Sequence, residues 1–155
     1  SGADRDGELG EEHEPETHLI PNALAAAAGR GQTLKIFGTD YDTPDGTCLR
    51  DYIHVEDLSQ GHILALRRLL DGERALACNL GTGAGDSVRD DIRAIETVTG
   101  RTVPAEEAGR RPGDVPALVA DTSFAKSLGF APARSDMTQI VTDAWRFYAA
   151  KAGLA

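Results

Sequence analysis

The chain lacks any long apolar run and holds only two cysteines. No stretch of its 155 residues approaches the ~20 apolar residues of a membrane-spanning helix. Residues 1–16 have no basic stretch followed by an apolar core, so we predict neither a membrane span nor a signal peptide. Cys48 and Cys78 are too few for a disulfide framework in a domain of this size. We therefore expect reduced thiols and a cytoplasmic protein.

Positive charge and aromatic side chains are also scarce. The chain has 16 Lys and Arg residues against 25 Asp and Glu residues, which gives a net charge of −9. This balance argues against nucleic acid and against anionic membranes as partners, because both require a basic surface. Aromatic residues make up 5% of the chain, so the core must rest on aliphatic side chains. The histidines and cysteines show no metal-ligand spacing.

Strands alternate with helices along the sequence, which predicts an α/β fold. Residues 1–17 are acidic and show no hydrophobic periodicity, so we expect a loose segment there and one α/β domain over residues 18–155. The predicted helices span residues 18–30, 57–70, 88–99, 121–128 and 136–152. The predicted strands span residues 34–37, 52–55, 75–80 and 102–108.

A glycine-rich loop, Gly81 to Gly85, lies between a predicted strand and a predicted helix. Its glycines stand at positions i, i+2 and i+4, whereas the dinucleotide fingerprint has them at i, i+2 and i+5. We interpret the loop as a tight turn, with Ser87 capping the next helix and Asp90 completing a capping box. Asp91 lies near the apolar face of that helix, where a carboxylate lowers stability.

Charged residues at two turns are candidates for a binding site. Arg110 and Arg111 precede Pro112-Gly113-Asp114, and an arginine pair at a turn can bind a diphosphate in bidentate fashion. Arg50 can supply the opposite side of such a site, although solvated surface arginines explain the same residue types. His54 and Asp57 invite an acid–base interpretation, but the apolar strand around His54 and the cap position of Asp57 favour structural roles.

Four runs of residues carry a resemblance to a known family. They are HLIPNAL from His18, DGTCLRDYIHVEDLSQGHILAL from Asp45, NLGTGAGDSV from Asn79 and RRPGDVPALVADTSFAK from Arg110. In this order and spacing they closely resemble the UDP-glucose 4-epimerases of the extended short-chain dehydrogenase/reductase group. The resemblance covers nearly the whole chain.

The resemblance also implies parts that this sequence does not contain. Members of the family bind NAD through a glycine-rich turn and react through a Tyr-x-x-x-Lys pair. None of Tyr41, Tyr52 and Tyr148 is followed by Lys at the fourth position. The chain therefore resembles the C-terminal, substrate-binding lobe, without most of the Rossmann lobe, and we expect it to carry no catalytic residue and to bind no NAD alone. The complete enzyme is expected to use NAD and to form a homodimer through the missing lobe.

The resemblance assigns binding roles to residues of this chain. It implies that the phosphates of a UDP-sugar contact Arg50 and Arg111, and that Asp114 binds the uridine ribose. It places the sugar end of the pocket at Leu118. The residues implied around the uracil and its nucleotide are Lys35, Ile36, Phe37, His18 and Leu19.

The implied activity is the interconversion of UDP-glucose and UDP-galactose, in galactose metabolism. The alternatives are a related nucleotide-sugar epimerase or dehydratase, and a non-catalytic module that binds UDP-sugars.

Overall fold

The computed structural model describes residues 1–75 and 77–154. Helices and short strands are interspersed along the described chain, which agrees with the α/β prediction. The helices are α1 (Leu19–Ala27), α2 (Val55–Leu70), α3 (Val88–Thr99), α4 (Ser123–Ser127) and α5 (Met137–Ala152). The strands are β1 (Leu34–Phe37), β2 (Leu49–Arg50), β3 (Asp86–Ser87), β4 (Ala105–Ala108) and β5 (Ala117–Leu118).

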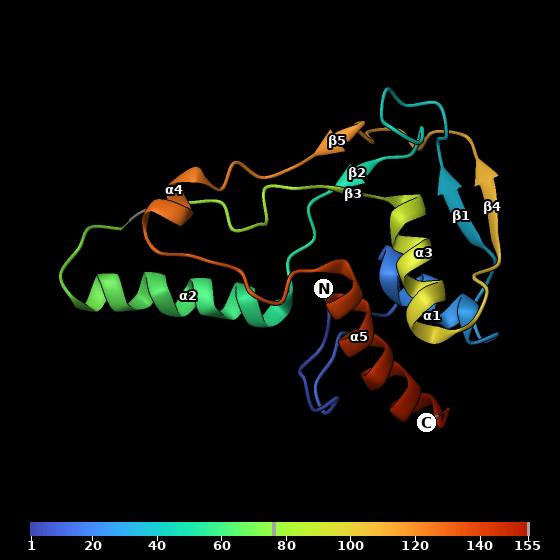
Figure 1. Cartoon of the computed structure of the whole chain (residues 1–155), viewed down its shortest axis with the longest axis horizontal. Helices are drawn as coiled ribbons and strands as arrows, with labels where there is room; N and C mark the ends of the chain where they lie inside the picture. The colour runs from blue at the N-terminus through green and yellow to red at the C-terminus, as the bar shows by residue number, and fades with distance from the viewer. Residues whose placement is uncertain (76, 155) are drawn as a thin grey trace.

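The core lies where α1, α3 and α5 meet beside β1 (Figure 1). Small side chains on α1 let the other helices approach closely, and Ala23 is completely buried there. Ile95 of α3 and Ile140 of α5 are also fully buried. The core therefore rests on aliphatic residues, as the shortage of aromatics predicts.

Two small sheets join segments that are distant in the sequence. In one, β1 pairs in parallel with β4, with Leu34 opposite Ala105. In the other, β2 lies between β3, which is antiparallel to it, and β5, which is parallel. This second sheet places Arg50 opposite Leu118. The two sheets stand near each other above the helical core (Figure 1).

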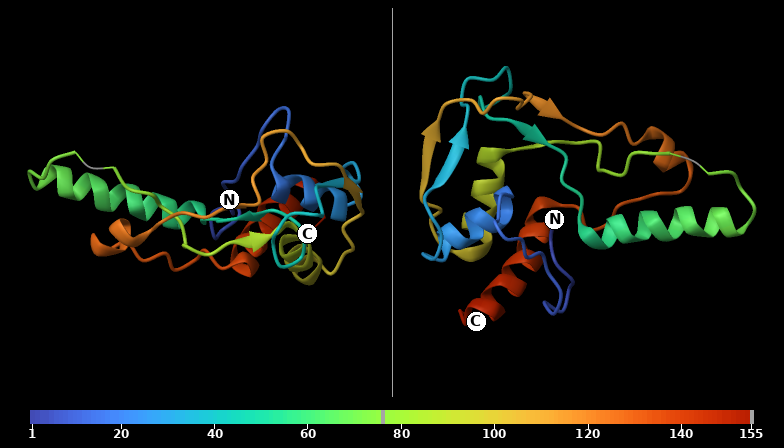
Figure 2. Two further views of the ribbon diagram at one scale, coloured as in Figure 1. Left: turned by 90° about the horizontal axis from the view of Figure 1, so that it is seen from above. Right: turned by 180° about the vertical axis from the view of Figure 1, so that it is seen from behind.

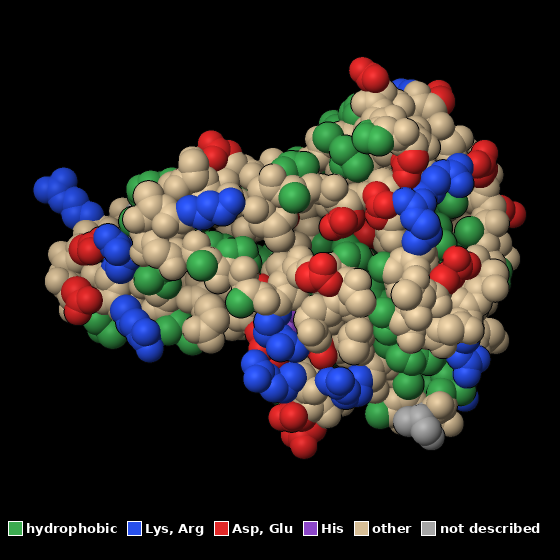
Figure 3. Space-filling model, in the orientation of Figure 1, with side chains coloured by type: hydrophobic (Ala, Val, Ile, Leu, Met, Phe, Trp, Pro, Cys, Tyr) green, Lys and Arg blue, Asp and Glu red, His purple; other side chains and the backbone are tan. Residues whose placement is uncertain are grey.

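Helix α2 extends away from this core, and α4 lies beside its outer part in all three views (Figures 1 and 2). Several large apolar side chains on these two helices remain exposed: Ile63, Leu66, Leu69, Leu70 and Phe124. We call α2 and α4 the arm. Apolar side chains reach the surface along it (Figure 3). None of the helices in the described residues combines the length and hydrophobicity that a bilayer span requires.

The prediction of a strand at residues 52–55 is wrong. The strand lies earlier, at Leu49–Arg50, and α2 begins at Val55. His54 caps the helix, because its Nδ1 accepts the backbone N–H of Glu56 at 3.0 Å. The strand-favouring residues after Arg50 have no ladder partner, so their β propensity is not realised.

Asp57 is not the helix cap that the sequence predicts. Its carboxylate accepts the backbone N–H groups of Ala133 and Arg134 at 3.0 and 2.8 Å, and the hydroxyl of Ser135 at 2.7 Å. The carboxylate therefore fixes the irregular segment before α5. His54 is fully buried, with Nε2 3.2 Å from Asp143 Oδ2, which agrees with a structural role.

The predicted buried strand at residues 75–80 is also wrong for the residues described. Ala75 and residues 77–80 form no strand, and Leu76 lies outside the described residues. Ala77 and Asn79 are exposed, while Leu80 is half-buried against Gly61 of α2. A buried strand needs a neighbouring strand that completes its hydrogen bonds, and no strand in the described chain pairs with this segment.

The acidic segment 1–17 makes defined contacts. Ala3 is buried and forms an antiparallel bridge with Gly10. Gly10 lies against the ring of Phe147, where a Cβ would have no room. Arg5 pairs with Glu56 at 2.9 Å. These contacts join the first ten residues to the start of α2 and to α5, while the division of the chain at residue 17 remains a prediction.

Asp91 lies inside the core, as the helical pattern predicts. It is completely buried, and neither carboxylate oxygen has a hydrogen-bond partner among the described residues. Burial raises the pKa of Asp91 to about 7; the nearby Tyr52 hydroxyl acts to lower it, whereas the carboxylates of Asp86 and Asp90 add to the rise. Below pH 7 the folded protein therefore favours the protonated, neutral carboxyl.

Replacement of Asp91 by Leu should stabilise the protein in a pH-dependent way. The unfolded carboxyl ionises near pH 4, whereas the folded one has a pKa of about 7. Between pH 4 and pH 7 the folded state binds a proton that the unfolded state has released. The free energy of unfolding therefore falls as the pH rises from 4 toward 7. We expect Asp91→Leu to raise the free energy of unfolding at pH 8 by on the order of 3 kcal/mol, with a much smaller gain at pH 4.

Urea denaturation at both pH values measures this difference. Asp71→Leu, at the exposed C-terminal end of α2, is the matched control and should show no such gain. An equal gain for Asp91→Leu at pH 4 and pH 8 would assign the effect to packing and contradict the proposed ionisation.

Candidate functional site

Two arginines share one carboxylate between β2 and the turn before β5. Arg111 donates from Nε and Nη2 to the two oxygens of Asp114, each at 3.1 Å. Arg50 Nη2 lies 3.7 Å from Asp114 Oδ1. The Asp114 side chain is 16% exposed and Arg50 is 26% exposed, whereas Arg111 is 57% exposed. The arrangement presents two guanidinium groups at a partly open surface.

The Arg50 side chain is held from its own side of the site. Its Nη1 donates to the carbonyl of Leu49 at 2.8 Å and to that of Val115 at 3.0 Å. These bonds fix the plane of the guanidinium, which leaves Nη2 toward Asp114. A guanidinium held in this way loses little conformational freedom when it binds an anion.

The end of β1 adjoins the same cluster. The Arg111 guanidinium carbon lies 5.3 Å from the centre of the Phe37 ring, within the range of a cation–π contact. Side chains alternate along a strand, so Lys35 shares the face of Phe37, and both are accessible. Ile36 points into the core and is 5% exposed, so only its backbone can meet a ligand.

The other predicted site residues lie in two places. Leu118 stands opposite Arg50 in the β2–β5 register and is 63% exposed, so it belongs beside the arginine cluster. His18 and Leu19 instead line a hollow of about 1000 Å³ between α1, α5 and the acidic segment. No hydrogen bond or ion pair of the described residues joins His18 to the arginines. Asp51 and Tyr52 line the same hollow. Because they directly follow Arg50, they connect the hollow to the arginine cluster along the chain.

Asp51, which directly follows Arg50, has a structural role beside the candidate site that the sequence did not predict. Its carboxylate accepts the backbone N–H groups of Thr82, Gly83 and Ala120 at 2.9, 3.0 and 3.2 Å, and the hydroxyl of Thr82 at 2.6 Å. Burial raises the pKa of Asp51, but these hydrogen bonds outweigh burial and hold the pKa below its usual range. The only signal in the sequence is its position directly after Arg50.

The glycine-rich loop does not fit a dinucleotide. A phosphate would need the free N–H groups of such a loop, but the Asp51 carboxylate already accepts those of Thr82 and Gly83. The carboxylate would also repel a phosphate. Ser87 caps α3, and Asp90 accepts the backbone N–H of Ser87, so the capping box is confirmed. The interpretation of this loop as a tight turn therefore agrees with the structure.

Replacement of Asp51 by Ala should loosen this loop. It would leave the part-buried N–H groups of Thr82 and Ala120 and the exposed one of Gly83 without their partner, and an unpaired buried group costs about 1–3 kcal/mol. We expect Asp51→Ala to lower the free energy of unfolding at pH 7 by about 2–4 kcal/mol. Because a lowered pKa gives stability that is lost as the pH falls, the difference should shrink below pH 4.

Urea denaturation of Asp51→Ala and of the control Asp42→Ala, an exposed aspartate of the loop after β1, measures the effect. Equal and small losses in the two variants would show that Asp51 does not hold the loop.

Comparisons with known proteins agree with the resemblance in the sequence. The family model described as "NAD dependent epimerase/dehydratase family" matches residues 7–81. A UDP-glucose 4-epimerase from Rhizobium leguminosarum bv. trifolii is 49% identical over 150 residues, which are 96% of this chain and 46% of that protein. The chain thus spans about half the length of the curated relatives it matches.

Solved structures give the same result. The UDP-glucose 4-epimerase from Brucella ovis in complex with NAD is 54% identical, with a TM-score of 0.89 over 95% of this chain and 46% of that chain. The enzyme from Stenotrophomonas maltophila, with bound NAD and formylated UDP-arabinopyranose, is 42% identical. It has a TM-score of 0.92 over 99% of this chain and 46% of that chain.

The fold and the matches therefore show that the chain is similar to one half of proteins of the NAD dependent epimerase/dehydratase family, two of whose solved structures cited above hold NAD. Within that family its likeness is to the enzymes named UDP-glucose 4-epimerase, so the resemblance found in the sequence is confirmed.

Proposed function

We propose that this chain is the C-terminal, UDP-sugar-binding lobe of a UDP-glucose 4-epimerase, which interconverts UDP-glucose and UDP-galactose. The observation that carries the proposal is the pair of arginines, Arg50 and Arg111, gathered on one aspartate beside the exposed face of β1. A pair of guanidinium groups with an adjacent aromatic ring matches the parts of a uridine diphosphate.

Binding of the diphosphate would replace Asp114 as the partner of both arginines. A diphosphate carries more negative charge and more acceptor oxygens than one carboxylate, so the exchange is favourable for two charge-assisted contacts. Asp114 would then be available to accept a hydroxyl of the ribose. Phe37 and the β1 backbone at Ile36 would contact the uracil, with Lys35 at the rim.

The role of this lobe is to hold the sugar nucleotide in place. Contacts to the nucleotide, far from the reacting carbon, orient the sugar and lower the barrier indirectly. The hydride chemistry needs NAD and the part of the enzyme that this chain does not include. We therefore expect the chain alone to be inactive, and the complete enzyme to be a cytoplasmic homodimer.

A test on the chain itself is UDP binding measured by calorimetry. A charge-assisted contact to phosphate contributes about 1.5–3 kcal/mol. We therefore expect Arg50→Ala and Arg111→Ala each to weaken UDP binding at least about tenfold. Arg67→Ala, at an exposed position on α2, is the matched control and should leave binding unchanged. Wild-type chain that fails to bind millimolar UDP, or equal binding by all three variants, would contradict the site.

The identity of the sugar should depend on Leu118. Leu at this position leaves more room than Tyr would, so we propose that the complete enzyme also accepts UDP-N-acetylglucosamine. A methylene-sized change in a pocket alters discrimination by ~1–3 kcal/mol, so dual activity is expected. Leu118→Tyr should lower kcat/KM for UDP-N-acetylglucosamine relative to UDP-glucose, whereas Val119→Tyr, the next residue, should not. An unchanged ratio in Leu118→Tyr would remove Leu118 from the sugar pocket.

A second candidate substrate is a UDP-pentose. The Stenotrophomonas maltophila structure holds formylated UDP-arabinopyranose, and that protein is 42% identical to this chain. Turnover of a panel of nucleotide sugars by the complete enzyme separates the two candidates.

A further inference from the structure

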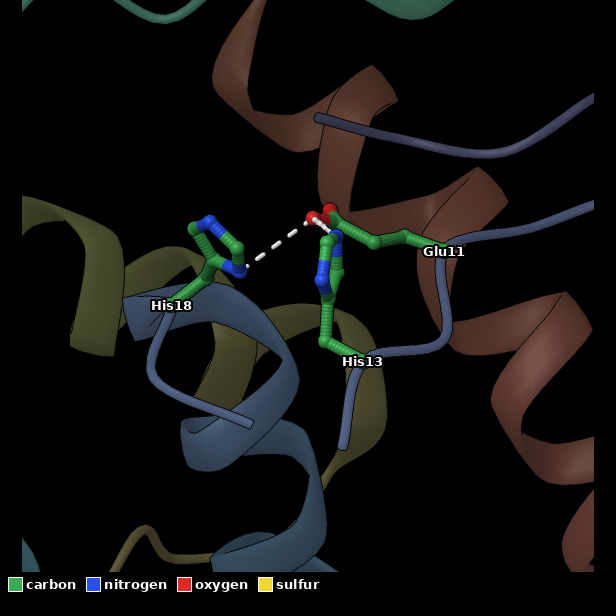
Figure 4. A group of neighbouring side chains, drawn as sticks. All are labelled: Glu11, His13 and His18. Carbon is green, nitrogen blue, oxygen red and sulfur yellow. Dashed lines mark ion pairs between the residues drawn. The ribbon is translucent and has the colours of Figure 1, made fainter. Parts of the chain in front are cut away.

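Two histidines and a glutamate converge at the edge of the hollow beside α1. Glu11 and His13 lie in the acidic segment, and His18 immediately precedes the helix. Their side chains point toward one another (Figure 4), and one ligand atom from each lies within 4.8 Å of the others. The spacing in the sequence does not predict a metal site, because the turn between His13 and His18 brings the two rings together only in the folded chain.

Two of the three distances between the ligand atoms match those of a zinc site. Glu11 Oε1 lies 3.3 Å from His13 Nε2 and 3.2 Å from His18 Nδ1. Zinc binds such atoms at about 2.0–2.1 Å, so two of its tetrahedral ligands are about 3.3 Å apart. The pairs Glu11–His13 and Glu11–His18 therefore already have the separation of two ligands of one tetrahedral zinc ion. The third, between the two histidines, needs only a rotation of exposed side chains, whose ring centres lie 4.9 Å apart.

The surroundings favour a cation over another use of these residues. Glu16 Oε1 lies 2.8 Å from His18 Nδ1 and also accepts the backbone N–H groups of Thr17 and His18. Zinc at His18 Nδ1 would displace the proton that this nitrogen now shares with Glu16, and the Glu16 carboxylate would remain beside the ion as additional negative charge. The chain as a whole carries a net charge of −9. Two imidazoles with one carboxylate suit zinc, whereas magnesium prefers oxygen ligands and water.

We propose that Glu11, His13 and His18 bind one zinc ion, with the fourth position open toward the hollow. Bound zinc would tie residues 11–13 to the start of α1 and so order the acidic segment. The proposal does not rest on the proposed UDP-sugar site, but it shares His18 with the residues that the resemblance places near the nucleotide.

The experiment is calorimetric titration of the 155-residue chain with zinc chloride, together with cobalt(II) as a spectroscopic probe. We expect one equivalent to bind, and a four-coordinate cobalt spectrum that added zinc removes and added magnesium does not. Glu11→Gln, His13→Ala and His18→Ala should each weaken binding at least about tenfold, because a three-ligand site does not survive loss of one ligand. His62→Ala, which removes an exposed histidine on α2, should leave binding unchanged.

Three results would overturn the proposal. One is the absence of saturable zinc binding below millimolar concentration. Another is an equal loss of affinity in His62→Ala, which would indicate scattered surface binding. The third is loss of binding in Cys78→Ser with retention in His13→Ala, which would place the metal at the half-buried thiol. Circular dichroism of each variant verifies that it remains folded.

Discussion

The structure depends on aspartate side chains that satisfy backbone groups outside helices and sheets. Much of this chain is irregular, and a buried N–H group without a partner is costly. Asp51 accepts three backbone N–H groups from two separate loops, two of them part-buried, and Asp57 accepts two part-buried ones from the segment before α5. Asp45 likewise binds the backbone and hydroxyl of Thr47 and the hydroxyl of Ser87. In these irregular segments, carboxylates accept the backbone hydrogen bonds that neighbouring strands accept in a sheet.

This constraint also explains the rigidity of the candidate site. Arg50 and Asp51 are consecutive, so one side chain faces Asp114 while the next ties β2 to the glycine-rich loop and to Ala120. The backbone that carries the Arg50 guanidinium is therefore held in place by the hydrogen bonds of the next residue, Asp51, to two loops. Asp91 is the exception among the buried aspartates, since it has no hydrogen-bond partner in the described chain and favours its proton.

Local patterns in the sequence predicted the local structure well. The helices α1, α3, α4 and α5, the strand β1 and the capping box at Ser87 follow from periodicity and cap residues within a few positions. The strand predicted at residues 52–55 was wrong, and so was the one predicted at residues 75–80 for the residues of it that the structure describes, because strand formation needs a partner that composition does not reveal. The roles of Asp51 and Asp57 were not predictable either, since their bonds reach residues 31 to 78 positions away.

The parallel pairing of β1 with β4 and of β2 with β5 has a kinetic consequence. Leu34 meets Ala105, and Leu49 meets Ala117, so neither sheet can close until most of the chain has been arranged. To form contacts between distant segments, the chain between them must first lose conformational entropy. Folding is therefore slow when such contacts are needed. During that delay the apolar side chains of the arm and the unpaired strand edges face solvent together. Refolding yield should then fall with protein concentration, because the slow intermediates can meet one another before the sheets close.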